Sequence, residues 1–238
     1  MREENNIKII YYGIGGSTIV KSIDKLKKLN FKRKINLKDS VISFYYTFKI
    51  NLNRYNLTFI DIARTNNDSI FDILETEIDE YDNIIILGDD NNNFIKNINN
   101  NLSYKNIKFI NIIINEETIK RSNITNKKII SKEIIEFYIN KLINRDETFE
   151  GRVYVSKETP IKKCGFGAYN VLSECKELYS QKELVLNIIS GEKLYLDTLS
   201  YITDPILEYI NENAKVKVKN IVSEELNENF IVNILGVQ

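Results

Sequence analysis

Short apolar runs alternate with amphipathic stretches through the first half of the sequence. Apolar residues at helical spacing predict helices over residues 69–80 and 93–102, and Ile19, Ile23 and Leu26 predict another after Gly13–Ser17. Predicted strands occupy residues 7–12, 41–50, 57–62, 84–87 and 107–114. Continuous Ile-rich strands separated by helices indicate a parallel sheet that is covered on both faces. Residues 1 to about 115 are therefore predicted to form a Rossmann-like layer.

A longer helix is predicted near the middle of the chain, over residues 131–143. Its apolar positions are Ile134, Ile135, Tyr138 and Leu142, which recur at helical spacing. Ser131 is the predicted N-cap, and Glu133 suits the positive end of the helix dipole. This helix is expected to link the two halves of the chain.

The second half of the sequence has a different pattern of apolar and polar residues. Strands are predicted over residues 151–156 and 183–190, and helices over 167–179 and 197–211, with Pro205 expected to begin a straight helical run. Residues 215–219 and 230–234 alternate between apolar and polar, which is typical of a mixed or antiparallel sheet with one solvated face. Lys215, Lys217 and Lys219 would lie on that solvated face. The predicted parts are residues 1–130, the central helix and following loop at 131–146, and a smaller α+β domain at 147–238.

Composition excludes several classes of protein. The 238 residues contain 33 Lys and Arg against 33 Asp and Glu, so no nucleic-acid partner is expected. The absence of His removes the commonest general base and metal ligand, and two cysteines suit a reducing cytoplasm. The longest apolar runs are far too short for a bilayer span, so no membrane partner is expected. The 41 Ile and 32 Asn against 3 Ala reflect AT-rich coding rather than function.

Several segments, in chain order, resemble motifs of the tubulin/FtsZ superfamily. The most specific lie near the C-terminus, where Leu186–Leu194 resembles the family's "VNITGG-DL" strand and turn, and the final strand is similar too. The other matching segments are 7–17, 142–146, 164–168, 207–214, 215–226 and 230–237. The resemblance implies an FtsZ-like α/β fold, with a Rossmann-like parallel sheet, a central helix and a C-terminal domain with a mixed sheet. It also implies a cytoskeletal or filament-associated role.

One departure from the family concerns the loop that holds GTP phosphates. In the family this loop reads "GGGTGTG", whereas here Gly88 is followed by Asp89 and Asp90. Two like unit charges about 4 Å apart repel by roughly 4 kcal/mol at an effective dielectric of 20. Asp89 and Asp90 therefore oppose a triphosphate unless Mg²⁺ mediates, which makes them weak metal candidates. We expect no cofactor; the alternative is GTP or GDP with Mg²⁺.

The segment Gly13–Ser17 supports two interpretations. As nucleotide-binding remnants, Gly13, Gly15, Gly16, Ser17 and Gly88 would cradle a phosphate or the base edge. Glycines at these positions are also needed simply for a tight strand-to-helix turn and close helix packing. Thr18 stands where the dinucleotide fingerprint requires a third glycine.

A second departure lies in the family's hydrolytic "synergy" loop. Asn144 and Asp146 match its "NxD" motif, but the second catalytic Asp falls on Phe149, with Glu150 one position along. Because catalytic geometry is tight, this displacement predicts that GTP hydrolysis has been lost. The expected partner is the protein itself or another FtsZ/tubulin-like protein, bound through the family's longitudinal face. The alternatives are a divergent GTPase of the same superfamily and a generic Rossmann-like small-molecule binder.

Overall fold

The computed structural model separates the chain into two compact units. The first comprises Met1–Ile114 and Ser131–Phe149, and the second comprises Asn115–Ile130 and Glu150–Gln238. The structure describes residues 5–23, 32–38, 41–52, 55–62, 74, 77–79, 83–90, 92–103, 107, 109–114, 124–144, 148–175 and 177–238.

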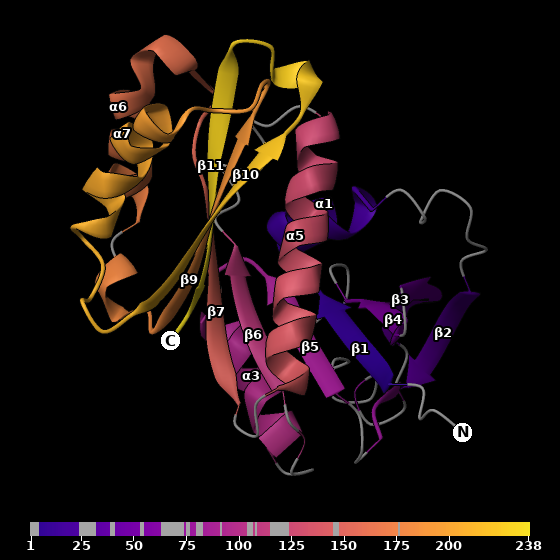
Figure 1. Cartoon of the computed structure of the whole chain (residues 1–238). Helices are drawn as coiled ribbons and strands as arrows, with labels where there is room; N and C mark the ends of the chain where they lie inside the picture. The colour runs from indigo at the N-terminus through magenta and orange to yellow at the C-terminus, as the bar shows by residue number, and fades with distance from the viewer. Residues whose placement is uncertain are drawn as a thin grey trace. The chain divides into compact units, whose positions relative to one another are not determined.

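The first unit is built on a sheet whose centre is parallel (Figure 1). Strands β4, β1, β5 and β6 run parallel, as predicted, while β2 and β3 add antiparallel strands beside β4. Strand β2 was not predicted, because its sequence KRKINLK lacks an apolar run. The strands are β1 (Asn5–Tyr11), β2 (Lys32–Lys38), β3 (Val41–Leu52), β4 (Tyr55–Asp61), β5 (Asn83–Gly88) and β6 (Phe109–Ile114).

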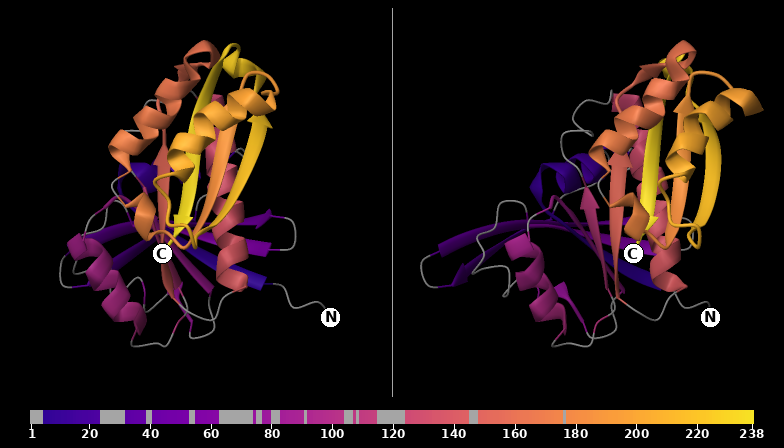
Figure 2. Two further views of the ribbon diagram at one scale, coloured as in Figure 1. Left: turned by 60° about the vertical axis from the view of Figure 1, so that its left-hand side comes forward. Right: turned by 90° about the vertical axis from the view of Figure 1, so that its left-hand side faces the viewer.

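One face of this sheet is covered by α3 (Asn92–Ser103), the helix predicted over 93–102 (Figure 2). Its Ile95, Ile98 and Leu102 pack in one buried cluster with Ile10 and Ile86 of the strands. Leu74 and Ile78, from the helix predicted over 69–80, belong to the same cluster. Most of that predicted helix lies outside the described residues.

Helix α5 (Ile124–Ile143) contains the predicted central helix but begins seven residues earlier than expected. Ser131 is a fully buried residue inside the helix, so its prediction as the N-cap was wrong. The sequence ITNKKII supplied no clear apolar face, which is why the first two turns were missed. The four apolar positions predicted to be inside are all buried: Ile134, Ile135, Tyr138 and Leu142.

The second unit contains a mixed sheet, as predicted, in the order β10, β9, β11, β7, with β8 paired to β11. Strands β9 and β10 are parallel, whereas β11 is antiparallel to both β9 and β7. The strands and helices of the two units together confirm the predicted α/β class. The strands are β7 (Phe149–Val155), β8 (Thr159–Pro160), β9 (Glu183–Ser190), β10 (Lys215–Val222) and β11 (Asn229–Val237).

Helices α6 (Cys164–Glu174) and α7 (Leu196–Leu207) lie together on one side of this sheet (Figure 1). They share a buried cluster with the strands. Both were predicted with shifted ends, and Pro205 lies inside α7 near its end instead of beginning a straight run. Short 3₁₀ helices follow β8, α6 and β10: η2 (Ile161–Lys163), η3 (Leu178–Ser180) and η4 (Glu224–Leu226).

The predicted solvated face of the second sheet was wrong for its inner strands. Strands β9 and β11 are buried almost throughout. Even Asn187 and Asn233, which are partners in the β9–β11 register, are fully buried. The edge strand β10, in contrast, is largely accessible to solvent, with Lys215 and Lys217 exposed. Across the described part of the chain, no helix combines the length and apolarity that crossing a membrane requires.

Candidate functional site

The glycine-rich segment after β1 is the first turn of helix α1 (Gly13–Lys21) rather than a loop before it. Gly13 has a φ of 65°, a left-handed conformation that favours glycine, and it turns the chain directly from strand to helix. The helix ends at Lys21, so Ile23 lies after it, contrary to prediction. Tyr11 of β1 and Leu87 of β5 are register partners, which places this turn beside Gly88 and Asp89.

The Asp89 carboxylate caps the N-terminus of α1. The Ile14 N–H donates to Oδ2 at 2.9 Å, and the Gly15 N–H donates to Oδ1 at 2.8 Å. These N–H groups belong to the first turn of the helix, where no backbone carbonyl is available and the helix dipole favours an anion. A helix N-terminus of this kind is also where proteins bind phosphate. In this protein the anion is one of its own side chains.

Close approaches account for the glycines of this turn. A Cβ on Gly15 would lie 2.4 Å from Asp89 Oδ1, and one on Gly16 would lie 2.3 Å from the Leu87 carbonyl oxygen. A Cβ on Gly13 would likewise meet the Asp89 carboxylate at 2.3 Å. Ser17, the remaining candidate of the segment, is partly exposed in α1. The three glycines thus serve the packing of α1 against Asp89 and β5.

Gly88 has a packing role as well, because the ring of Tyr12 lies against it. A Cβ on Gly88 would lie 2.2 Å from that ring. The Tyr12 hydroxyl donates to the Asp89 carbonyl oxygen at 3.0 Å, and the Tyr12 N–H donates to the Leu87 carbonyl at 3.1 Å. Burial, followed by the Asp89 and Asp90 carboxylates, raises the pKa of Tyr12 above its ordinary value of 10.0. The sequence analysis missed Tyr12, although its place between β1 and Gly13 was a usable signal.

The two adjacent carboxylates have different surroundings. Asp89 is turned back onto the helix amides, whereas Asp90 is exposed to solvent. Within the described ranges, no group of three or more His, Cys, Asp or Glu side chains is placed to hold a metal ion. A phosphate at the Ile14 and Gly15 N–H groups would have to displace Asp89, so this arrangement does not fit a phosphate at those two amides.

The residues predicted for the synergy loop do not form one cluster among the described residues. Asn144 is exposed and closes the end of α5, with its Nδ2 donating to the Asn140 carbonyl at 2.8 Å. Asp146 lies outside the described residues. Glu150 was predicted in a loop but lies in β7, because the alternating pattern of that strand begins at Phe149.

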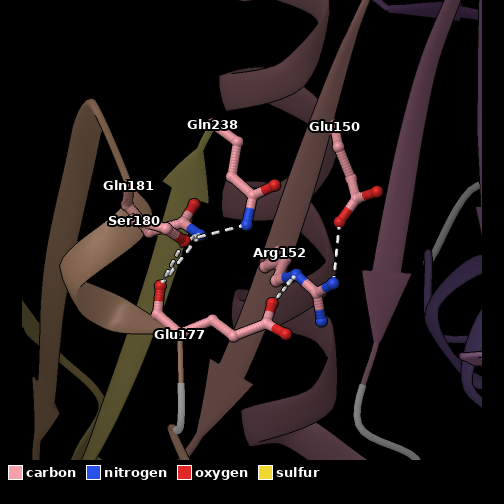
Figure 3. Close-up of polar contacts among 6 residues, drawn as sticks. All are labelled: Glu150, Arg152, Glu177, Ser180, Gln181 and Gln238. Atoms are coloured by element: carbon pink, nitrogen blue, oxygen red, sulfur yellow. Dashed lines mark hydrogen bonds and ion pairs between the residues drawn. The ribbon is translucent and has the colours of Figure 1, made fainter.

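Glu150 takes part in an ion-pair network around Arg152 (Figure 3). Arg152 Nη2 lies 2.8 Å from Glu150 Oε1, and Arg152 Nε lies 2.7 Å from Glu177 Oε2. The Ser180 hydroxyl donates to the Glu177 carbonyl and accepts a hydrogen bond from Gln238 Nε2, at 2.8 and 2.9 Å. The network joins β7 to the segment around η3 and to the residue that follows β11. Its evident role is to hold these segments together.

No family model and no curated protein matches this sequence. A mutant FtsZ and an empty FtsZ dimer, both from M. jannaschii, are structurally similar, with a TM-score of 0.43 and 10% and 8% identity. Each match covers 71% of this chain, but only 59% and 57% of the FtsZ chains. The G domain of the T. maritima FeoB iron transporter matches with a TM-score of 0.34 and 10% identity, over 62% of this chain and 87% of that one. These are likenesses of fold.

Proposed function

We propose that this protein is an FtsZ/tubulin-like, filament-associated protein that acts by protein–protein association and has lost GTP hydrolysis. The observation that carries the proposal is the Asp89 carboxylate on the Ile14 and Gly15 N–H groups, at 2.9 and 2.8 Å. It takes up the amides that a nucleotide phosphate would need at this turn. The order of FtsZ-like segments along the sequence supports the family part of the proposal.

Electrostatics explains why Asp89 opposes a nucleotide. Hydrogen bonds to a charged group contribute about 1.5–3 kcal/mol each, so a phosphate must first break two such bonds. The displaced carboxylate would then remain close to the incoming phosphate and repel it. Asp90, exposed at the same turn, adds a further negative charge.

The association part of the proposal follows from the family resemblance. The longitudinal face would use the Gly13–Ser17 and Gly88–Asn93 segments on one side and the Asn144–Glu150 segment on the other. Ile14 presents an apolar side chain on the first of these, 49% exposed. Without a γ-phosphate to act as a switch, association through this face should not depend on GTP. A cap on the filament of a true FtsZ is one form that such association would take.

The first prediction is that the purified protein contains no guanine nucleotide and releases no phosphate from GTP above background. Chromatography of the denatured protein and a phosphate-release assay check this. Isothermal titration with GTP, with and without Mg²⁺, measures binding directly. Stoichiometric GDP in the denatured protein, or Mg²⁺-dependent GTP binding, would overturn the proposal and favour a divergent GTPase.

The second prediction concerns the cap itself. Asp89→Ala should lower the free energy of unfolding by about 0.5–2 kcal/mol, the usual cost of removing a helix N-cap. Asp90→Ala is the matched control, and its effect should stay within about 0.5 kcal/mol because its side chain is exposed. Chemical denaturation of both variants measures the difference. Equal effects of the two substitutions would mean that Asp89 does not cap α1.

A further inference from the structure

The outer face of helix α7 carries an unusual row of side chains. Asp197, Tyr201, Asp204 and Glu208 are spaced i, i+4, i+7 and i+11, so they form one stripe, and all four are exposed. The opposite stripe of the helix is buried in the core of the second unit and includes Ile202, Thr203 and Ile206. The exposed stripe therefore points away from the unit that the helix belongs to.

The two carboxylates at the C-terminal end of this stripe, Asp204 and Glu208, are in an unfavourable setting. No Lys or Arg occurs between Leu194 and Ala214, so the helix has no positive charge of its own. Asp204 and Glu208 are four residues apart, where like charges repel, and they lie at the end of α7, where the helix dipole disfavours anions. A positively charged partner would remove both penalties.

Exposed aromatic side chains lie in the same helix and just beyond each of its ends. Tyr195, Tyr201 and Tyr209 are 83, 68 and 62% exposed. Tyrosine is enriched among the residues that contribute most to protein–protein binding, and its ring attracts cations. A surface that combines tyrosines with carboxylates therefore suits a partner that presents lysines.

The second unit itself carries such a row of lysines on β10. This strand lies at the edge of the sheet (Figure 1). Val216 packs toward the cluster beneath α6 and α7, so the alternation of the strand directs Lys215 and Lys217 to the other face. Both lysines are exposed, and within the described residues neither has an ion-pair partner. Lysines on an edge strand also discourage pairing between two such edges, so contact through a different surface is favoured.

We propose that two copies of this chain associate head to tail, with Lys215 and Lys217 of one copy on Asp204 and Glu208 of the next. Alternate strand residues are spaced about 6.6 Å apart, and helical residues four apart are separated by about 6 Å, so the two rows match in register. Tyr201, beside Asp204 on the stripe, would lie against the lysine stems. Because the two surfaces are on opposite faces of the unit, each copy offers one of each, and the contact extends into an open chain of copies.

This inference rests on the association part of the proposed function and adds to the longitudinal face a second contact, made by the second unit. Charge reversal tests it on the full-length protein. In sedimentation velocity at low salt, the wild type should self-associate, and added salt should weaken the association. The variant Asp204→Lys/Glu208→Lys and the variant Lys215→Glu/Lys217→Glu should each associate at least about tenfold more weakly.

Restoring complementarity separates a contact from a folding defect. An equimolar mixture of the two reversed variants should associate again, since each supplies the charge that the other lacks. Glu212→Lys, an exposed reversal outside the stripe, is the control and should leave association unchanged.

Association that the reversals do not affect, a wild type that stays monomeric, or a mixture that fails to associate would each overturn the inference. Binding of a lysine-rich peptide to a monomeric wild type would instead indicate a different, basic partner. None of these outcomes bears on nucleotide binding, which tests the proposed function separately.

Discussion

Replacing Gly16 with alanine is expected to destabilise the first unit by about 1–3 kcal/mol, the usual range for forcing an extra methyl group into a packed site. The added Cβ would lie 2.3 Å from the Leu87 carbonyl oxygen. This oxygen is part of the backbone of β5, so it cannot move aside as the end of a flexible side chain could. Helix α1 would have to shift away from the sheet. That shift would also lengthen the hydrogen bonds from Ile14 and Gly15 to Asp89.

Gly165→Ala provides the matched control. Gly165 also lies in a helix, α6, but a Cβ there meets no atom within 4 Å. Both substitutions gain helix propensity, worth up to about 1 kcal/mol, so their difference isolates the contact with β5. Urea denaturation of the two variants measures it. If Gly16→Ala proved as stable as Gly165→Ala, the close packing of α1 on β5 would be wrong.

The sequence predicted the buried parts of the fold well and the polar parts poorly. Strands β1, β5 and β6 were found because continuous apolar runs mark strands buried on both faces. The same rule missed β2, whose Lys, Arg and Asn residues leave no continuous apolar run. Strand β11 was predicted from an alternation of apolar and polar residues, but its residues are buried almost throughout. Helical spacing of apolar residues missed the start of α5 in turn, because polar residues such as Asn126 are buried there.

The sequence analysis grouped Gly13–Ser17 and Gly88 as candidate residues through the family resemblance, without their contacts. Parallel strands bring their carboxyl ends to one edge, and in the structure β1 and β5 place these segments side by side. The sequence alone does not indicate which of the adjacent residues Asp89 and Asp90 contacts the backbone amides at the start of α1. The structure shows that Asp89 binds the amides while Asp90 is exposed, a choice that depends on the geometry of the turn.

The same limit applies to Glu150. The match to the family's synergy loop placed Glu150 one position from the second catalytic Asp. A sequence match compares positions, so it gave no information on which side chain Glu150 contacts. In the structure its carboxylate pairs with Arg152, two residues along the same strand, at 2.8 Å. The i, i+2 spacing of Glu150 and Arg152 would have indicated this pair if β7 had been predicted to begin at Phe149.

Replacing Leu142 with alanine is expected to lower the free energy of unfolding by about 2–5 kcal/mol, the range for removing most of a buried leucine side chain. Leu142 is fully buried in the part of α5 that belongs to the first unit. The loss combines the transfer of its methyl groups with the cavity that remains. Because Tyr138 and Ile139, one turn earlier, are also buried, the neighbouring side chains have little freedom to fill that cavity.

Asn140→Ala in the same helix is the control, since its side chain is exposed and its backbone carbonyl, which accepts from Asn144, is retained. Its effect should stay within about 0.5 kcal/mol. Equilibrium denaturation followed by circular dichroism measures both variants. A cost below about 0.5 kcal/mol for Leu142→Ala would place that face of α5 in solvent. The prediction of a helix buried along Ile134, Ile135, Tyr138 and Leu142 would then be wrong, and the assignment of α5 as the central helix would fail with it.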